Sequence, residues 1–138
     1  MSIIHVNQIK VQVVKLFSEL IDLSDLKNPP DGIKENFLLT RDLAAYSIHY
    51  LAGATPPEAA LAVTDGGTDN GIDAIYFDES NKRLYLVQSK WIKDGIGEPE
   101  NGDVKKFMSG IRDLFNLRFD RFNSKIKNKQ AIVAKVDG

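Results

Sequence analysis

The chain has 138 residues, of which 43% are hydrophobic, and this length and composition predict one compact domain spanning residues 1–138. It contains no cysteine, which excludes disulfides, thiolate metal sites and cysteine nucleophiles, and its two histidines lie far apart, which argues against a zinc site. The net charge of −1 by itself gives no sign of a nucleic-acid partner. The sequence contains no apolar run of membrane-spanning length and no signal-peptide pattern, so we expect a cytoplasmic protein with no membrane partner.

Two helices are predicted before residue 55. Apolar residues at helical spacing predict an amphipathic helix over residues 4–23. A second helix is predicted from about Glu35 or Thr40 to Leu51, with Gly53 as its C-terminal stop. Asp42 then lies in the first turn of this second helix, where a carboxylate interacts favourably with the helix N-terminus.

A short helix and a glycine-containing loop come next. The stretch Thr55-Pro-Pro-Glu58 has the form of a capping box and predicts a helix over about Pro56 to Val63. The loop from Asp65 to Gly71 contains three glycines, which permit positive φ angles and a close approach of the backbone to a ligand. Asp65 and Asp69 are either metal or water ligands or parts of a plain turn.

A β-hairpin follows, with predicted strands Gly71–Phe77 and Arg83–Trp91. With Ser80 and Asn81 at the centre of the connection, the expected cross-strand pairs on one face are Phe77 with Leu84, Ile75 with Leu86, and Asp73 with Gln88. Lys90 is then diagonal to Asp73. A carboxylate, an amide oxygen and an ammonium group are therefore expected to converge at one end of the hairpin.

This set of groups suits phosphodiester hydrolysis. The Asp73 carboxylate and the Gln88 side-chain carbonyl are hard oxygen ligands of the kind that Mg²⁺ takes, and Lys90 would orient a water or neutralise a phosphate. The alternative interpretation is an ordinary amphipathic hairpin with a solvated polar end. Trp91 either stacks on a base or fills the core, and we expect core packing.

The residues after the hairpin are basic. Residues 1–81 carry five Lys or Arg against twelve Asp or Glu, net −7, whereas residues 82–138 carry thirteen against seven, net +6. A polar loop over residues 93–102 leads into a helix with Asp103 as its N-cap and with a predicted buried stripe of Val104, Phe107, Ile111 and Leu114. The last segment, from about Phe119 to Val136, fits a helix better than a strand. The basic half would attract phosphates or is simply a solvated face.

The stretch Asp69-Asn-Gly-Ile-Asp-Ala-Ile followed by Leu86-Val-Gln-Ser-Lys-Trp resembles the Mrr-like branch of the PD-(D/E)xK nuclease superfamily, in which Gln often replaces the first acid of E-x-K. More narrowly, it resembles the N-terminal domain of AIPR-type abortive phage infection proteins. The resemblance implies an α/β restriction-endonuclease-like core, in which a central mixed sheet of at least four strands contains the hairpin and is flanked by helices. Only one hairpin is clear, so we expect hidden strands or an incomplete sheet, and a chain that is the N-terminal part of a longer protein.

The resemblance also implies a metal-dependent endonuclease that hydrolyses nucleic-acid phosphodiester bonds in phage defence or restriction. The catalytic residues would be Asp73, Gln88, Lys90 and Asp42, although the family normally has Glu where this chain has Asp42. The ligands of a Mg²⁺ or Mn²⁺ ion would be Asp73, Gln88, Ser89 and Asp69. The side chains expected to contact nucleic acid, with DNA favoured over RNA, are Lys93, Lys105, Lys106 and Arg112.

Two further hypotheses concern partners. The same fold would also serve as a non-catalytic module that binds nucleic acid or mediates oligomerisation. An open sheet edge invites pairing with a second copy, so a homodimer is a possible assembly.

Overall fold

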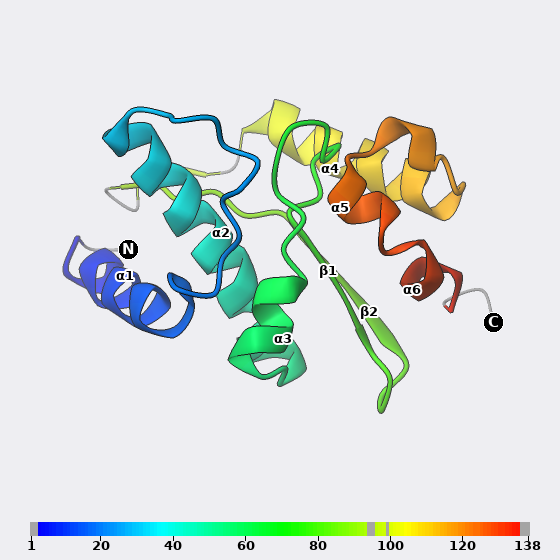
Figure 1. The fold of residues 1–138 in the computed structure, drawn as a ribbon, viewed down its shortest axis with the longest axis horizontal. Helices are drawn as coiled ribbons and strands as arrows, with labels where there is room; N and C mark the ends of the chain where they lie inside the picture. The colour runs from blue at the N-terminus through cyan, green and yellow to red at the C-terminus, as the bar shows by residue number, and fades with distance from the viewer. Residues whose placement is uncertain (1–2, 94–95, 99, 136–138) are drawn as a thin grey trace.

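The computed structural model describes residues 3–93, 96–98 and 100–135. Within these residues, six α-helices, one 3₁₀ helix and a two-stranded antiparallel sheet make the protein mixed α/β. The hairpin lies between a group of helices formed by α1, α2 and α3 and a second group formed by the C-terminal helices (Figure 1). Three residues of the predicted 93–102 loop, Asp94, Gly95 and Pro99, and Val136 of the terminal segment lie outside the described residues. No described helix is both long and apolar enough to cross a membrane.

The first helix, α1, spans Ile3–Phe17 and ends six residues before the predicted boundary. The amides of Leu20 and Ile21 both donate to the Phe17 carbonyl, which closes a turn directly after the helix. Phe17 and Ile21 are both buried, so the turn returns the chain to the core. Tertiary packing of Ile21 therefore overrides the helical periodicity that predicted a longer helix.

Helix α2 spans Asp31–Ala52 and begins earlier than predicted. The Pro30 carbonyl accepts hydrogen bonds from the amides of Ile33 and Lys34, so the helix starts directly after the proline pair. Asp42 therefore lies about three turns inside the helix, and the prediction that it occupies the first turn is wrong. The predicted C-terminal stop is confirmed, because Gly53 has φ 71° and its amide donates to the His49 carbonyl.

Helix α3 spans Pro56–Leu61 and begins with the predicted capping box. The Thr55 hydroxyl oxygen accepts from the Glu58 amide at 3.4 Å and donates to the Glu58 carboxylate at 2.7 Å. The sequence pattern therefore located the start of this helix correctly.

The hairpin consists of β1, Ala74–Asp78, and β2, Arg83–Val87. The predicted register is confirmed, because Ile75 pairs with Leu86 and Phe77 pairs with Leu84. Both strands are shorter than predicted. Regular pairing ends at Ala74 and Val87, and the Asp73 amide donates to the Val87 carbonyl at 2.7 Å, so Asp73 and Gln88 lie just beyond the ladder.

A short extended segment after α3 lies along the other edge of β1. Val63 forms an isolated antiparallel bridge with Ala74, and the Ile75 amide donates to the Ala62 carbonyl at 2.9 Å. The Thr64 amide donates to the Asp73 carbonyl at 2.7 Å. In the described part of the chain the sheet is thus an antiparallel hairpin with one additional bridge, not the mixed sheet of four or more strands that the resemblance implies.

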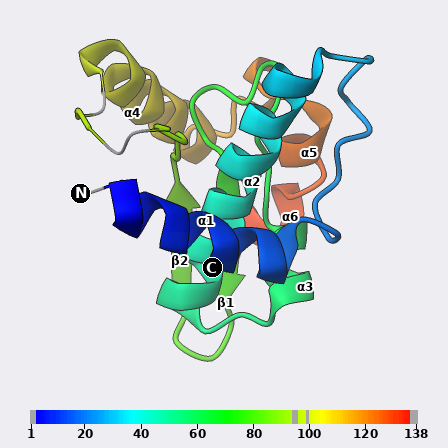
Figure 2. The same ribbon diagram turned by 90° about the vertical axis from the view of Figure 1, so that its left-hand side faces the viewer.

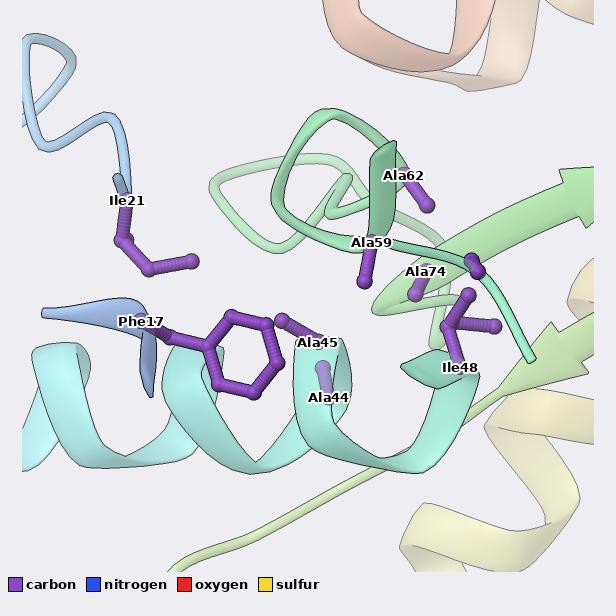
Figure 3. Packing of buried hydrophobic residues seen from close by; sticks show 9 residues of the cluster. Phe17, Ile21, Ala44, Ala45, Ile48, Ala59, Ala62 and Ala74 are labelled. Atoms are coloured by element: carbon purple, nitrogen blue, oxygen red, sulfur yellow. The ribbon is translucent and has the colours of Figure 1, made fainter. Parts of the chain in front are cut away.

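The two faces of the hairpin belong to different hydrophobic clusters, as period-2 alternation requires. One cluster joins α1, α2 and α3 to Ala74 and is built mainly from small side chains around Phe17. Figure 3 shows the Phe17 ring pointing toward Ala45 on α2, and Figure 2 shows α1 lying across α2. The other cluster joins Ile75 to the C-terminal helices through Leu114 and Ile126.

Helix α4 spans Asn101–Phe115, and its N-cap is Glu100, so the predicted N-cap Asp103 instead lies in the first turn. Leu114 of the predicted stripe is buried, but Val104 is 41% exposed because the helix contacts the rest of the protein mainly through its C-terminal half. The terminal segment is helical, as predicted, but it is divided into three short pieces: η1 (Phe119–Arg121), α5 (Ser124–Lys127) and α6 (Gln130–Ala134).

Candidate active site

The candidate site is built on the segment of residues 64–73, which we call the site loop. Within it, the Thr64 hydroxyl donates to the Ile72 carbonyl at 2.9 Å, and the Asp69 carboxylate accepts from the Gly71 amide at 2.9 Å. Thr68 and Asn70 have positive φ angles of 59° and 55°. These local bonds fold the segment back on itself, so that its first and last residues both lie next to the start of β1.

Two glycines allow α4 to contact the site loop. A Cβ atom on Gly110 would lie 2.0 Å from the Asn70 carbonyl oxygen, and one on Gly71 would lie 2.8 Å from the Phe107 backbone nitrogen. Both distances are shorter than the 3.0 Å below which real Cβ atoms essentially never make contacts, so this packing favours glycine at both positions. Gly71 also has φ 81°, which favours glycine independently. The Asn70 side chain then reaches across to donate to the Asp113 carboxylate at 2.8 Å.

Three carboxylates meet at this loop. Asp65, Asp69 and Asp73 each offer an oxygen, and these oxygens lie within 4.8 Å of one another. Asp73 is 6% exposed, Asp69 is 8% exposed, and the Asp65 side chain is 14% exposed. Such close, poorly hydrated carboxylates repel one another unless a proton or a cation lies between them.

The electrostatic effect is largest at Asp73. Burial raises the pKa of Asp73 to about 9, and the neighbouring carboxylates of Asp65 and Asp69 raise it as well. The Ser89 amide, which donates to the Asp73 carboxylate at 2.8 Å, opposes this shift but does not cancel it. Burial and the two neighbouring carboxylates therefore favour the protonated form of Asp73 more strongly than in an exposed aspartate.

Arg41 is the main contributor to the site that the sequence analysis missed. Its side chain is fully buried on α2, and its Nε donates to the Asp65 carboxylate at 2.9 Å. The other guanidinium nitrogens form a bidentate pair with Asp25 at 2.7 and 2.8 Å, and one of them also donates to the Asp22 carbonyl. Arg41 thus joins α2, the α1–α2 connection and the site loop. The one feature of the sequence that could have identified Arg41 is its position in a helix segment that also carries the apolar residues Leu39, Ala44 and Ala45.

The C-terminal helices also hold the site loop in place. The Asn123 side chain donates to the Thr64 carbonyl at 2.9 Å, and Lys125 Nζ donates to the Asp65 carbonyl at the same distance. Lys125 also contacts the Asp25 carboxylate at 3.3 Å. The site loop is therefore held by α2 on one side and by the C-terminal segment on the other.

The segment after β2 is bonded to α2 and α4. The Ser89 hydroxyl donates to the Thr40 carbonyl at 3.1 Å, and the Trp91 amide donates to the Thr40 hydroxyl oxygen at 3.2 Å. The Gln88 side-chain amide donates to the Asp103 carbonyl at 2.8 Å. These bonds fix the path of the Gln-Ser-Lys tripeptide beside the carboxylate cluster.

A cleft of about 720 Å³ opens over this arrangement. It is lined by five residues that the sequence analysis assigned to catalysis or metal binding: Asp69, Asp73, Gln88, Ser89 and Lys90. Two of the predicted nucleic-acid contacts, Lys93 and Lys106, also line it. The other two, Lys105 and Arg112, are exposed on α4 but do not line the cleft.

Asp42 is the one predicted catalytic residue that the structure places elsewhere. It is fully buried, one carboxylate oxygen accepts from the Ser18 hydroxyl at 2.8 Å, and among the described residues the other oxygen has no hydrogen-bond partner. Burial raises the pKa of Asp42 to about 6, against the lowering effect of the Ser18 hydrogen bond. Its hydrogen-bond partner Ser18 lies directly after α1, which ends at Phe17.

Comparison with known proteins found no matching family model, no matching curated protein and no matching solved structure. A function is therefore inferred from the chemistry of the cleft.

Proposed function

We propose that this chain is a metal-dependent phosphodiesterase that cleaves nucleic acid, with the cleft above the site loop as its active site. The observation that carries the proposal is the lining of that one cleft, which combines the Asp65, Asp69 and Asp73 carboxylates with Lys90. Carboxylates alone would indicate a cation site, and a lysine alone would indicate an anion site. Their combination suits a phosphate group bound through a cation.

The donor set fits Mg²⁺ or Mn²⁺. All three carboxylates are hard oxygen ligands, and Mg²⁺ is usually bound by one or two carboxylates together with waters and a substrate phosphate. The raised pKa of Asp73 supports the same assignment, because a cation would relieve the repulsion that now favours a proton there. Gln88 donates through its amide nitrogen to Asp103, so its carbonyl oxygen is the side-chain atom that would serve as a further ligand.

A bound ion of this kind supplies charge stabilisation at the phosphate and a more acidic water. The chain itself supplies orientation and countercharge. The Ser89 amide holds the Asp73 carboxylate, and Arg41 holds the Asp65 carboxylate. The exposed ammonium group of Lys90 is the one that would contact the scissile phosphate or its attacking water.

The charge of the cleft predicts how phosphate binding depends on the metal. Its lining includes six carboxylate side chains but only three ammonium groups, those of Lys90, Lys93 and Lys106. A polyanion would therefore be repelled from the cleft in the absence of divalent cations. The proposal thus requires that both binding and cleavage of nucleic acid depend on a divalent ion.

The restriction-endonuclease-like core is part of the same proposal. Two features support it: the confirmed hairpin register, and the position of Asp73 and the Gln-Ser-Lys tripeptide together at one end of that hairpin. Helices cover both faces of the hairpin, as that fold would require.

The test is cleavage of supercoiled plasmid, single-stranded DNA and RNA with Mg²⁺, Mn²⁺ or EDTA. We expect metal-dependent cleavage that Lys90→Ala abolishes and that Lys127→Ala, on the exposed surface of α5, does not change. Adjacent lysines on α4 provide a second matched pair, because Lys106 lines the cleft and Lys105 does not. Lys106→Ala should weaken activity more than Lys105→Ala.

A different result would support the non-catalytic module. Nucleic-acid binding without cleavage, unchanged by EDTA and lost when Lys105, Lys106 and Arg112 are neutralised together, would place the binding surface on α4 and contradict the proposed active site. Full cleavage by Lys90→Ala would contradict the role given to that residue.

A further inference from the structure

Trp91 occupies a different environment from the one predicted. We expected core packing, but the side chain is half-buried and, among the described residues, belongs to neither hydrophobic cluster. It lines the cleft instead, next to Ile92 and on the same lining as the carboxylate cluster. An aromatic residue thus lines the cleft that holds the proposed metal ligands.

The backbone that carries Trp91 is held on α2. Its amide donates to the Thr40 hydroxyl oxygen at 3.2 Å, and two residues earlier the Ser89 hydroxyl donates to the Thr40 carbonyl at 3.1 Å. The Ser89 amide also binds the Asp73 carboxylate at 2.8 Å. These hydrogen bonds hold the backbone from Ser89 to Trp91 against α2 and, through Asp73, beside the carboxylate cluster.

Stacking on an aromatic side chain distinguishes single-stranded from duplex nucleic acid. In a duplex, the faces of each base are covered by neighbouring base pairs, and only base edges are accessible in the grooves. An aromatic side chain can therefore stack only on a base that is unstacked or extruded. The cleft volume of about 720 Å³ lies within the range of pockets that enclose whole small molecules.

We propose that the cleft takes a segment of single-stranded nucleic acid, with one base stacked on Trp91 and the adjoining phosphate over the Asp65, Asp69 and Asp73 cluster. This inference rests on the proposed function for its metal-bridged phosphate, and it adds the substrate class. Lys93 lies two residues beyond Trp91 on the same lining, where its ammonium group would contact a flanking phosphate. Stacking is tolerant of base identity, so binding would show little sequence preference.

The chain provides its own probe, because Trp91 is its only tryptophan. Intrinsic fluorescence of the full chain would be titrated with a 30-nucleotide oligo(dT), with a blunt 15-base-pair duplex of about the same phosphate number, and with an abasic strand of the same length as the oligo(dT). All titrations would contain Ca²⁺, which supplies divalent charge and is a poor cofactor for phosphodiester cleavage. We expect quenching by oligo(dT), little quenching by the abasic strand, and at least about 10-fold weaker binding of the duplex.

Two variants separate stacking from general apolar packing. By anisotropy of labelled oligo(dT), Trp91→Leu should bind roughly 5- to 100-fold more weakly, whereas Trp91→Phe, which keeps a ring, should lose much less. Equal affinity of the wild type for oligo(dT), duplex and abasic strand would overturn the inference, and this comparison needs no variant. Equal affinity of Trp91→Leu and wild type for oligo(dT) would also overturn it.

Failure of this inference differs from failure of the proposed function. Metal-dependent cleavage that shows no preference for single strands would refute the stacking assignment and leave the phosphodiesterase intact. Quenching by oligo(dT) without any cleavage in Mg²⁺ or Mn²⁺ would support the stacking assignment and contradict the phosphodiesterase.

Discussion

The free energy of unfolding of Asp42→Asn, measured relative to that of the wild type, should be higher at neutral and alkaline pH than at acidic pH. Asp42 is fully buried, and burial raises its pKa from a reference value of 3.8 to about 6. A carboxyl group whose pKa is higher in the folded chain favours folding while it is protonated. That contribution is complete below pH 3.8 and is lost as the pH rises through about 6.

The expected magnitude follows from the difference between the two pKa values. A shift of about two units, at about 1.4 kcal/mol per unit, corresponds to on the order of 3 kcal/mol between strongly acidic and neutral pH. Asparagine does not titrate and keeps an oxygen that can accept from Ser18. Its constant cost or benefit at the site cancels when the same variant is compared at two pH values.

The assay is urea denaturation of the wild type and Asp42→Asn at pH 4 and pH 8. We expect the free energy of unfolding of the variant, measured relative to the wild type, to be about 2 to 3 kcal/mol more favourable at pH 8 than at pH 4. Ser18→Ala provides an internal check, because loss of the hydroxyl donor removes the one interaction that lowers the Asp42 pKa and should steepen the pH dependence. A stability difference between Asp42→Asn and wild type that is the same at both pH values would refute the reasoning.

Two more predictions concern the supports of the site loop. Gly110→Ala should destabilise the protein by about 1–3 kcal/mol or more, because the new Cβ would meet the Asn70 carbonyl oxygen at 2.0 Å. The control is Gly102→Ala on the same helix, which should change stability little because no atom lies within 4 Å of its Cβ. Equal effects of the two variants on urea denaturation would show that α4 does not contact the site loop as described. Arg41→Leu should lower the free energy of unfolding by about 3 kcal/mol, at the lower end of the range for breaking a buried ion pair because Asp25 is one-third exposed. Arg41→Lys should restore only part of this stability, because lysine cannot form the bidentate pair with Asp25. An unfolding midpoint for Arg41→Leu equal to that of the wild type would contradict this prediction.

Features that depend on local chemistry could be predicted from the sequence. The Thr55 capping box and the Gly53 stop each involve residues a few positions apart, and both are confirmed. The hairpin register is also confirmed, because alternation of apolar residues around a short connection leaves few alternatives. That register located Asp73 and Gln88 at one end of the hairpin, where both line the cleft.

Features that depend on contacts between distant segments could not be predicted. Arg41 contacts Asp25 and Asp65, which lie 16 and 24 residues away, and no local pattern distinguishes it from a surface arginine. Because α2 starts at Asp31, Asp42 lies in the interior of this helix and not in its first turn, and its carboxylate contacts Ser18, directly after α1. For Trp91, hydrophobicity alone gave no means of separating a core position from a cleft wall.

The most direct test of the central claim is binding of Mn²⁺ to the wild type and to Asp73→Asn, measured by calorimetry in buffers of different ionisation enthalpy. The proposed active site predicts that the wild-type chain binds Mn²⁺ through the carboxylate cluster, and the raised pKa of Asp73 predicts that protons are released on binding at pH 7. Asp73→Asn should bind the ion much more weakly and without proton release. No binding to the wild type at millimolar Mn²⁺, or equal binding by the variant, would contradict the assignment of this cleft as a metal-dependent active site.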